Sequence, residues 1–90
     1  MLRHARTTSD GVQVFRDRIG RDAAFAGDPE AIARLAAEPW RTDWRIFGAP
    51  GQPEGLFLLL RPDVEPADVP LAPGDVWLPL DRDDLDAFLP

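Results

Sequence analysis

The run Leu56–Leu60 is the feature that most constrains the fold of this chain. It reads Leu-Phe-Leu-Leu-Leu, so an extended backbone places apolar side chains on both of its faces. Such a strand needs cover on both sides, as the central strand of a sheet has. A membrane span needs roughly 20 apolar residues, far more than this run contains. We therefore expect a buried central strand over residues 55–61 and no membrane span.

Two further strands are predicted around this run. Residues 43–48 alternate in character, which places Trp44 and Ile46 on one face of the sheet. Residues 75–80 alternate as well, and Pro79 indicates an edge strand, because proline cannot donate a hydrogen bond to a neighbouring strand. The sequence thus predicts a three-stranded, mostly antiparallel sheet.

The segment 62–74 connects the last two of these strands and contains four prolines. Proline removes a backbone donor and clashes with the preceding helical turn. This spacing excludes a regular helix and predicts an extended loop across the surface.

Helices are predicted before and after the strands. Asp28 is placed to cap a helix that starts at Pro29 and stops before Pro39. Five apolar residues at helical spacing favour another helix over residues 9–26. The alternative for that segment is a hairpin with its turn at Asp10-Gly11. Asp81 is expected to cap a short C-terminal helix with Leu85, Phe88 and Leu89 on its inner face.

These elements define the expected fold. We expect an α+β domain with two N-terminal helices, a three-stranded mostly antiparallel sheet and a short C-terminal helix. Ninety residues suit a single small domain, residues 1–90, with residues 1–8 mobile because they hold few large apolar side chains. A domain of this size buries only about 60% of its unfolded surface, so its core is thin.

The chain lacks most residue types that carry covalent, metal or phosphate chemistry. It has no cysteine, no lysine and a single histidine, His4, which excludes disulfides, thiolate nucleophiles, Schiff bases and Cys-ligated metals. Spacing gives no support to a triad of His4 with Ser9, because triads are defined by geometry. Asp63 with Glu65 or Asp68 lies in a polar loop that offers no desolvation to raise a pKa. We therefore expect a non-catalytic protein without cofactor or metal.

Charge is divided unevenly along the chain. Ten arginines against 16 acidic residues give a net charge of −6, with +1 on residues 1–45 and −7 on residues 46–90. The negative total argues against a nucleic-acid partner, and the acidic second half favours a basic protein. No apolar signal segment is present at the N-terminus, so a cytoplasmic location is expected. The excess of arginine and alanine, with no lysine, indicates a GC-rich and hence bacterial genome.

One aromatic and cationic segment is the best candidate for a partner-binding surface, because Trp and Arg are the residues most enriched at interface hot spots. The competing interpretation places Trp44 in the core and Trp40 at the corner between helix and strand. The acids near the C-terminus are expected to favour the start of the last helix and to attract a basic partner. The predicted partner-binding residues are Trp40, Arg41, Asp43, Trp44, Arg45, Asp83, Asp84 and Asp86.

A second surface is expected to mediate self-association. The sheet is apolar on both faces, and the predicted helices suffice to cover one of them. Phe47 and Trp77 on the other face would expose a large apolar area, which soluble monomers rarely leave open. The sequence therefore predicts a homodimer built on Phe47 and Trp77.

Together these features predict a small accessory or inhibitory protein that docks on a basic protein partner. The acidic second half and the Trp/Arg segment would provide the contacts. The alternative is a small ligand-binding or enzymatic subunit, with a pocket between sheet and helices lined by Trp44, Trp77 and Arg45. Tryptophan emission that responds to small molecules would favour the alternative.

Overall fold

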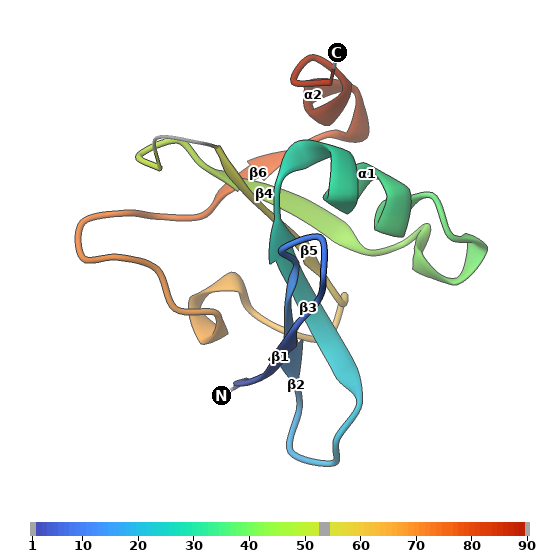
Figure 1. Cartoon of the computed structure of the whole chain (residues 1–90), viewed down its shortest axis with the longest axis vertical. Helices are drawn as coiled ribbons and strands as arrows, with labels where there is room; N and C mark the ends of the chain where they lie inside the picture. Colours follow the sequence, from blue (N-terminus) through green and yellow to red (C-terminus); the bar gives the residue numbers. More distant parts are fainter. Residues whose placement is uncertain (1, 53–54, 90) are drawn as a thin grey trace.

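The computed structural model of the protein describes residues 2–52 and 55–89. In this described part, six strands form one antiparallel sheet with the order β1-β2-β3-β5-β4-β6 (Figure 1). The strands are β1 (Arg3–Thr7), β2 (Gln13–Arg16), β3 (Asp22–Gly27), β4 (Arg45–Ala49), β5 (Leu56–Leu60) and β6 (Leu78–Leu80). The helices are α1 (Pro29–Ala36) and α2 (Arg82–Asp86), with 3₁₀ turns at Pro39–Arg41 and Pro66–Asp68. Neither α-helix of the described residues has the length and apolar character to cross a membrane.

Different elements cover the two faces of the sheet. On one face, α1 and α2 pack over a core that includes Ile32 and Leu59. On the other face, the loop after β5 packs Val64 and Val69 against a core that includes Leu58. β5 lies between β3 and β4, and four of its five residues are buried. The predicted central strand is therefore confirmed, and the chain itself covers both of its faces.

The helix predicted over residues 9–26 is wrong, because this segment forms β2 and β3 with their turns. Gly11 and Gly20 have φ values of 88° and 85°, a left-handed conformation that glycine adopts without steric cost. The apolar residues at helical spacing do not share one face. Phe15 packs on the loop-covered face of the sheet, whereas Ile19 is exposed at the β2–β3 turn. The alternative hairpin with its turn at Gly11 is correct.

The predicted three-stranded sheet is also wrong, because strands β1 to β3 were missed. β3 reads Asp-Ala-Ala-Phe-Ala-Gly, and alanine has the highest intrinsic helix propensity. Five of its six residues are nevertheless buried between β2 and β5. Burial of small side chains within the sheet outweighs the local preference for helix.

The N-terminal segment forms the edge strand β1. Arg3–Thr7 pair with β2, and the preceding Leu2 is buried in the loop-side core. Met1 lies outside the described residues. The mobility expected of residues 1–8 stays a prediction. The sequence analysis did not favour the pairing of Arg3–Thr7 with β2.

Several local predictions are confirmed. The Oδ1 of Asp28 accepts a hydrogen bond from the backbone N–H of Ala31 at 2.8 Å and so caps α1. Asp81 and Asp84 form a capping box at the start of α2. Trp44 and Phe47 pack on opposite faces of the sheet, as the alternation predicts. Pro79 lies in β6, which is an edge strand, although β6 is shorter than the predicted strand.

The predicted proline-rich loop is confirmed, and it covers one face of the sheet, which was not predicted. The described part of this loop contains no α-helix and one 3₁₀ turn. The indole Nε1 of Trp77 donates to the carbonyl oxygen of Val69 at 3.0 Å. The guanidinium of Arg45 donates to the carbonyl oxygen of Val64. These bonds and the buried valines fasten an irregular segment to the sheet.

Candidate protein-binding surface

The Trp corner, defined here as Trp40, Arg41, Asp43 and Trp44, lies where the chain passes from α1 to β4. The guanidinium carbon of Arg41 lies 5.6 Å from the ring centroids of both Trp40 and Trp44. It also lies 4.9 Å from the ring centroid of Phe25 in β3. Trp40 remains 67% exposed and Asp43 is exposed. The corner therefore exposes the Trp40 ring beside the Arg41 guanidinium, which is itself positioned by contacts with aromatic rings.

Trp44 anchors the corner in the core. Its ring is half-buried and stacks on Phe25, with the ring centroids 5.9 Å apart. Trp44 also packs against the helix-covered core. Trp44 therefore packs against the core without being fully buried, while Trp40 is the tryptophan that faces solvent.

Arg82, the first residue of α2, joins this helix to the Trp corner. Its Nη1 donates to the carbonyl oxygen of Ala36 at 2.9 Å. Its Nη2 lies 2.9 Å from the carbonyl oxygen of Arg41 and 3.2 Å from that of Thr42. Ala36 ends α1, where carbonyl groups lack helical partners and the helix dipole favours a cation. One guanidinium thus connects α1, the corner and α2, a role that the sequence did not indicate.

The predicted acidic residues of α2 have different roles. The backbone N–H of Asp81 donates to Asp84 Oδ2 at 3.0 Å, so Asp84 stabilises the helix start. Asp83 and Asp86 are exposed and belong to the helix that Arg82 attaches to the Trp corner. Two of the three predicted acids are therefore solvent-exposed on the helix that Arg82 attaches to the Trp corner.

Three predicted residues lie on the other face of the sheet. Arg45 has its guanidinium carbon 5.5 Å from the ring centroid of Phe47 and is separated from Trp44 by the sheet. Phe47 is only 6% exposed, and Trp77 is half-buried beside the loop. The loop covers the face on which self-association was expected. Trp44, Trp77 and Arg45 therefore do not line one pocket.

An apolar hollow of about 340 Å³ is lined by residues from the end of β4, the start of β5, β6 and the segment after α2. Its walls include Leu56, Leu78, Leu80 and Phe88. The ring of Phe88 packs on the buried Phe57 with the centroids 5.0 Å apart. Phe88 was predicted to face the core, yet most of its surface is exposed. This hollow was not predicted, because its walls come from segments far apart in the sequence.

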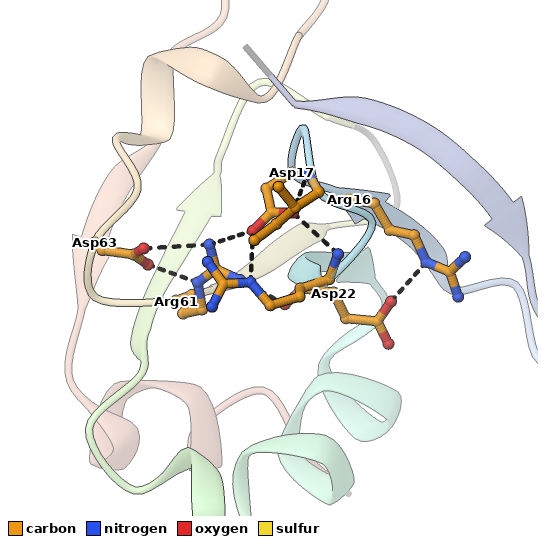
Figure 2. Close-up of polar contacts among 7 residues, drawn as sticks. Arg16, Asp17, Asp22, Arg61 and Asp63 are labelled. Carbon is orange, nitrogen blue, oxygen red and sulfur yellow. Dashed lines mark hydrogen bonds and ion pairs between the residues drawn. The ribbon is translucent and has the colours of Figure 1, made fainter.

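A network around Arg61 fastens the β2–β3 turn to the end of β5 (Figure 2). Arg61 Nη2 donates to Asp17 Oδ2 at 2.8 Å, and Arg61 Nε donates to Asp63 Oδ1 at 2.6 Å. Asp17 Oδ1 also accepts the backbone N–H groups of Ile19 and Arg21 at 3.0 and 2.9 Å. The backbone N–H of Arg21 and then the Arg61 side chain hold the pKa of Asp17 far below its usual range.

We expect replacement of Asp17 by asparagine to remove part of the acid sensitivity of folding. A depressed carboxyl pKa in the folded state stabilises the fold above about pH 4, and this contribution is lost as the pH falls toward the folded-state pKa. Urea unfolding at a series of pH values should show wild type and Asp17→Asn converging toward low pH. The exposed Glu65→Gln is the matched control. A constant difference between wild type and Asp17→Asn across that range would contradict the expectation.

The residues considered for catalysis do not converge. His4 Nε2 lies 3.1 Å from Thr7 Oγ1 within β1, and its ring packs edge-on against Phe15. Ser9 lies in the exposed β1–β2 turn. Among residues 2–52 and 55–89, no group of three His, Asp or Glu side chains is placed to hold a metal ion.

Comparison of the chain with models of protein families, with curated proteins and with solved structures found no match. Function is therefore inferred from the side chains and surfaces of this chain alone. The Trp corner and the helix α2 attached to it contain most of the predicted partner-binding residues.

Proposed function

We propose that this chain is a small non-catalytic accessory or inhibitory protein that docks on a basic protein partner. The observation that carries this proposal is the exposure of Trp40 on the Trp corner. Arg41 stacks beneath it, and Arg82 bonds to the backbone of the same corner. An aromatic side chain held in place before binding loses little conformational entropy when a partner covers it.

Charge supports the same surface. Asp43, Asp83 and Asp86 are exposed, and residues 46–90 carry a net charge of −7. Complementary charge speeds encounter with a basic partner and makes the association rate depend on salt. Trp40 would then supply short-range binding energy, while the acids supply steering. Self-association, which the sequence placed at Phe47 and Trp77, is proposed for a different surface below.

We expect Trp40→Ala and the double variant Asp83→Asn/Asp86→Asn to weaken partner binding in different ways. A partner captured from native lysate would first be identified and purified, and its kinetics measured at low and high salt. Loss of an interface tryptophan costs about 2 kcal/mol or more, which corresponds to a dissociation rate about 30-fold faster or more. The double Asn variant should lower the association rate several-fold at low salt and lose most of its salt dependence.

The matched controls are Glu65→Gln and Arg18→Gln, which change exposed charges away from the Trp corner. Thermal melts should confirm that all variants remain folded, since none of these side chains is buried. Equal binding by Trp40→Ala and the controls would refute the role of the corner. An association rate unaffected by salt or by the Asn replacements would refute the acidic steering.

A further inference from the structure

Besides Trp40 and Val76, three large apolar side chains of the described residues are exposed, and they lie at two ends of the molecule. Ile19, in the β2–β3 turn, is 73% exposed. Beside the apolar hollow, Leu78 and Phe88 are 45% and 58% exposed. Figure 1 shows the β2–β3 turn and α2 at opposite ends of the longest axis, which extends over 36 Å. The turn of one molecule therefore cannot reach the hollow of the same molecule.

The two ends also carry opposite charge. Residues 16–21, which contain the turn, hold three arginines and one aspartate, a net charge of +2. Residues 75–89, which include β6 and α2 beside the hollow, hold five aspartates and one arginine, a net charge of −4. Among the described residues, Arg18 forms no ion pair, so its charge is available next to Ile19. One end is an apolar projection with basic flanks, and the other is an apolar hollow with acidic flanks.

The projection is held in one conformation. The Asp17 carboxylate accepts two backbone N–H groups of the turn, and Arg61 ties that carboxylate to the end of β5 (Figure 2). Gly20 completes the turn with a positive φ. A turn already fixed in this way pays little ordering entropy when its tip is covered.

We propose that copies of this chain associate head to tail, with Ile19 of one copy in the apolar hollow of the next. The occupant is a second copy because the same chain carries both complementary parts, apolar to apolar and basic to acidic. The contact joins two different surfaces, so it is heterologous and produces open chains or closed rings rather than a two-fold dimer. It does not use Trp40, which separates it from the docking proposed above, although Asp83 and Asp86 of α2 contribute negative charge to both surfaces.

The association should be weak. One turn in one hollow buries less surface than the 1,200–2,000 Å² of a standard protein interface, which suggests a dissociation constant on the order of 10⁻⁴ M. Its electrostatic part acts between exposed charges and is screened by salt. We therefore expect the average mass to rise with concentration and to fall at high salt.

Sedimentation of the full chain from about 10 µM to about 1 mM, at low salt and at about 0.5 M salt, tests this proposal. Ile19→Asp removes the apolar projection and Phe88→Asp replaces an apolar wall of the hollow by a carboxylate, so each variant alone should stay monomeric. Mixed together, they should form a two-chain complex that does not grow further, because one intact turn and one intact hollow remain. Leu78→Asp is a second hollow variant, since Phe88 also packs on Phe57. Far-ultraviolet circular dichroism checks that each variant is folded.

Trp40→Ala is the matched control and should associate like wild type, which separates this proposal from the proposed docking function. A wild-type chain that stays monomeric at about 1 mM would overturn the proposal. So would self-association of Ile19→Asp alone, which would place the contact elsewhere. A two-fold dimer of wild type whose variants fail to complement each other would likewise replace the head-to-tail arrangement.

Discussion

Replacement of Leu58 by alanine should lower the free energy of unfolding by about 2–5 kcal/mol, the range for leucine truncation in a packed core. Leu58 is fully buried in the central strand, where it pairs with Ala26 of β3 and Phe47 of β4. Neither sheet neighbour can close the resulting cavity without moving a strand. A domain of this size has a total stability of about 5–15 kcal/mol, so the loss is a large fraction of it.

Urea denaturation of Leu58→Ala and Leu59→Ala measures this effect on the two faces of the sheet. Both residues are fully buried, but Leu59 lies under the helices and Leu58 lies under the loop. The exposed Leu78→Ala is the control, with an expected loss below about 1 kcal/mol. A loss below about 1 kcal/mol for Leu58→Ala would show that the loop relaxes into the space and forms no fixed cover.

Replacement of Arg82 by methionine should cost about 2 kcal/mol, because several carbonyl groups lose a charged donor at once. Methionine keeps much of the aliphatic stem, so the loss reports mainly on the guanidinium. The affected carbonyls belong to the end of α1 and to the Trp corner, including those of Ala36 and Arg41. Amide hydrogen exchange should therefore accelerate at the corner and at α2 more than in β5.

Arg82→Lys and Arg18→Met complete this experiment. A lysine ammonium keeps the charge but lacks the planar fork that reaches separate carbonyls, so we expect an intermediate loss. Arg18 is exposed in the β2–β3 turn, and its replacement should leave stability within about 0.5 kcal/mol. Equal stability of Arg82→Met and Arg18→Met would show that the contacts of Arg82 do not hold the corner.

Most of the fold from Asp28 onward could be predicted from the sequence because its signals agree with one another. Leu56–Leu60 is apolar at every position, Asp28 and Pro29 together mark a helix start, and the loop prolines permit no helix. In the first half, helical spacing and the alanines of β3 pointed to a helix, while Gly11 and Gly20 marked turns. Pairing of β3 with β5 favours the strand over the helix, and local propensity does not reveal pairing between residues so far apart in the sequence.

The candidate site was predictable in part for a related reason. Trp40, Asp83 and Asp86 are exposed residues of recognisable types, so composition alone singled them out. The role of Arg82 depends on carbonyl groups some 40 residues earlier in the chain, which no spacing rule connects to it. Phe47 and Trp77 were expected to be open because the sequence does not show which segment crosses above them.

The unequal cover of the sheet has a consequence for proteolysis. An irregular segment held by a few buried side chains opens at lower free energy than packed helices and is the preferred site of cleavage. A cut in the loop between β5 and β6 would uncover Phe47 and Leu58 while leaving the helix-covered face intact. The nicked chain would then expose an apolar sheet face on which further chains can associate. Stability and resistance to aggregation would thus depend on different segments of the same small protein.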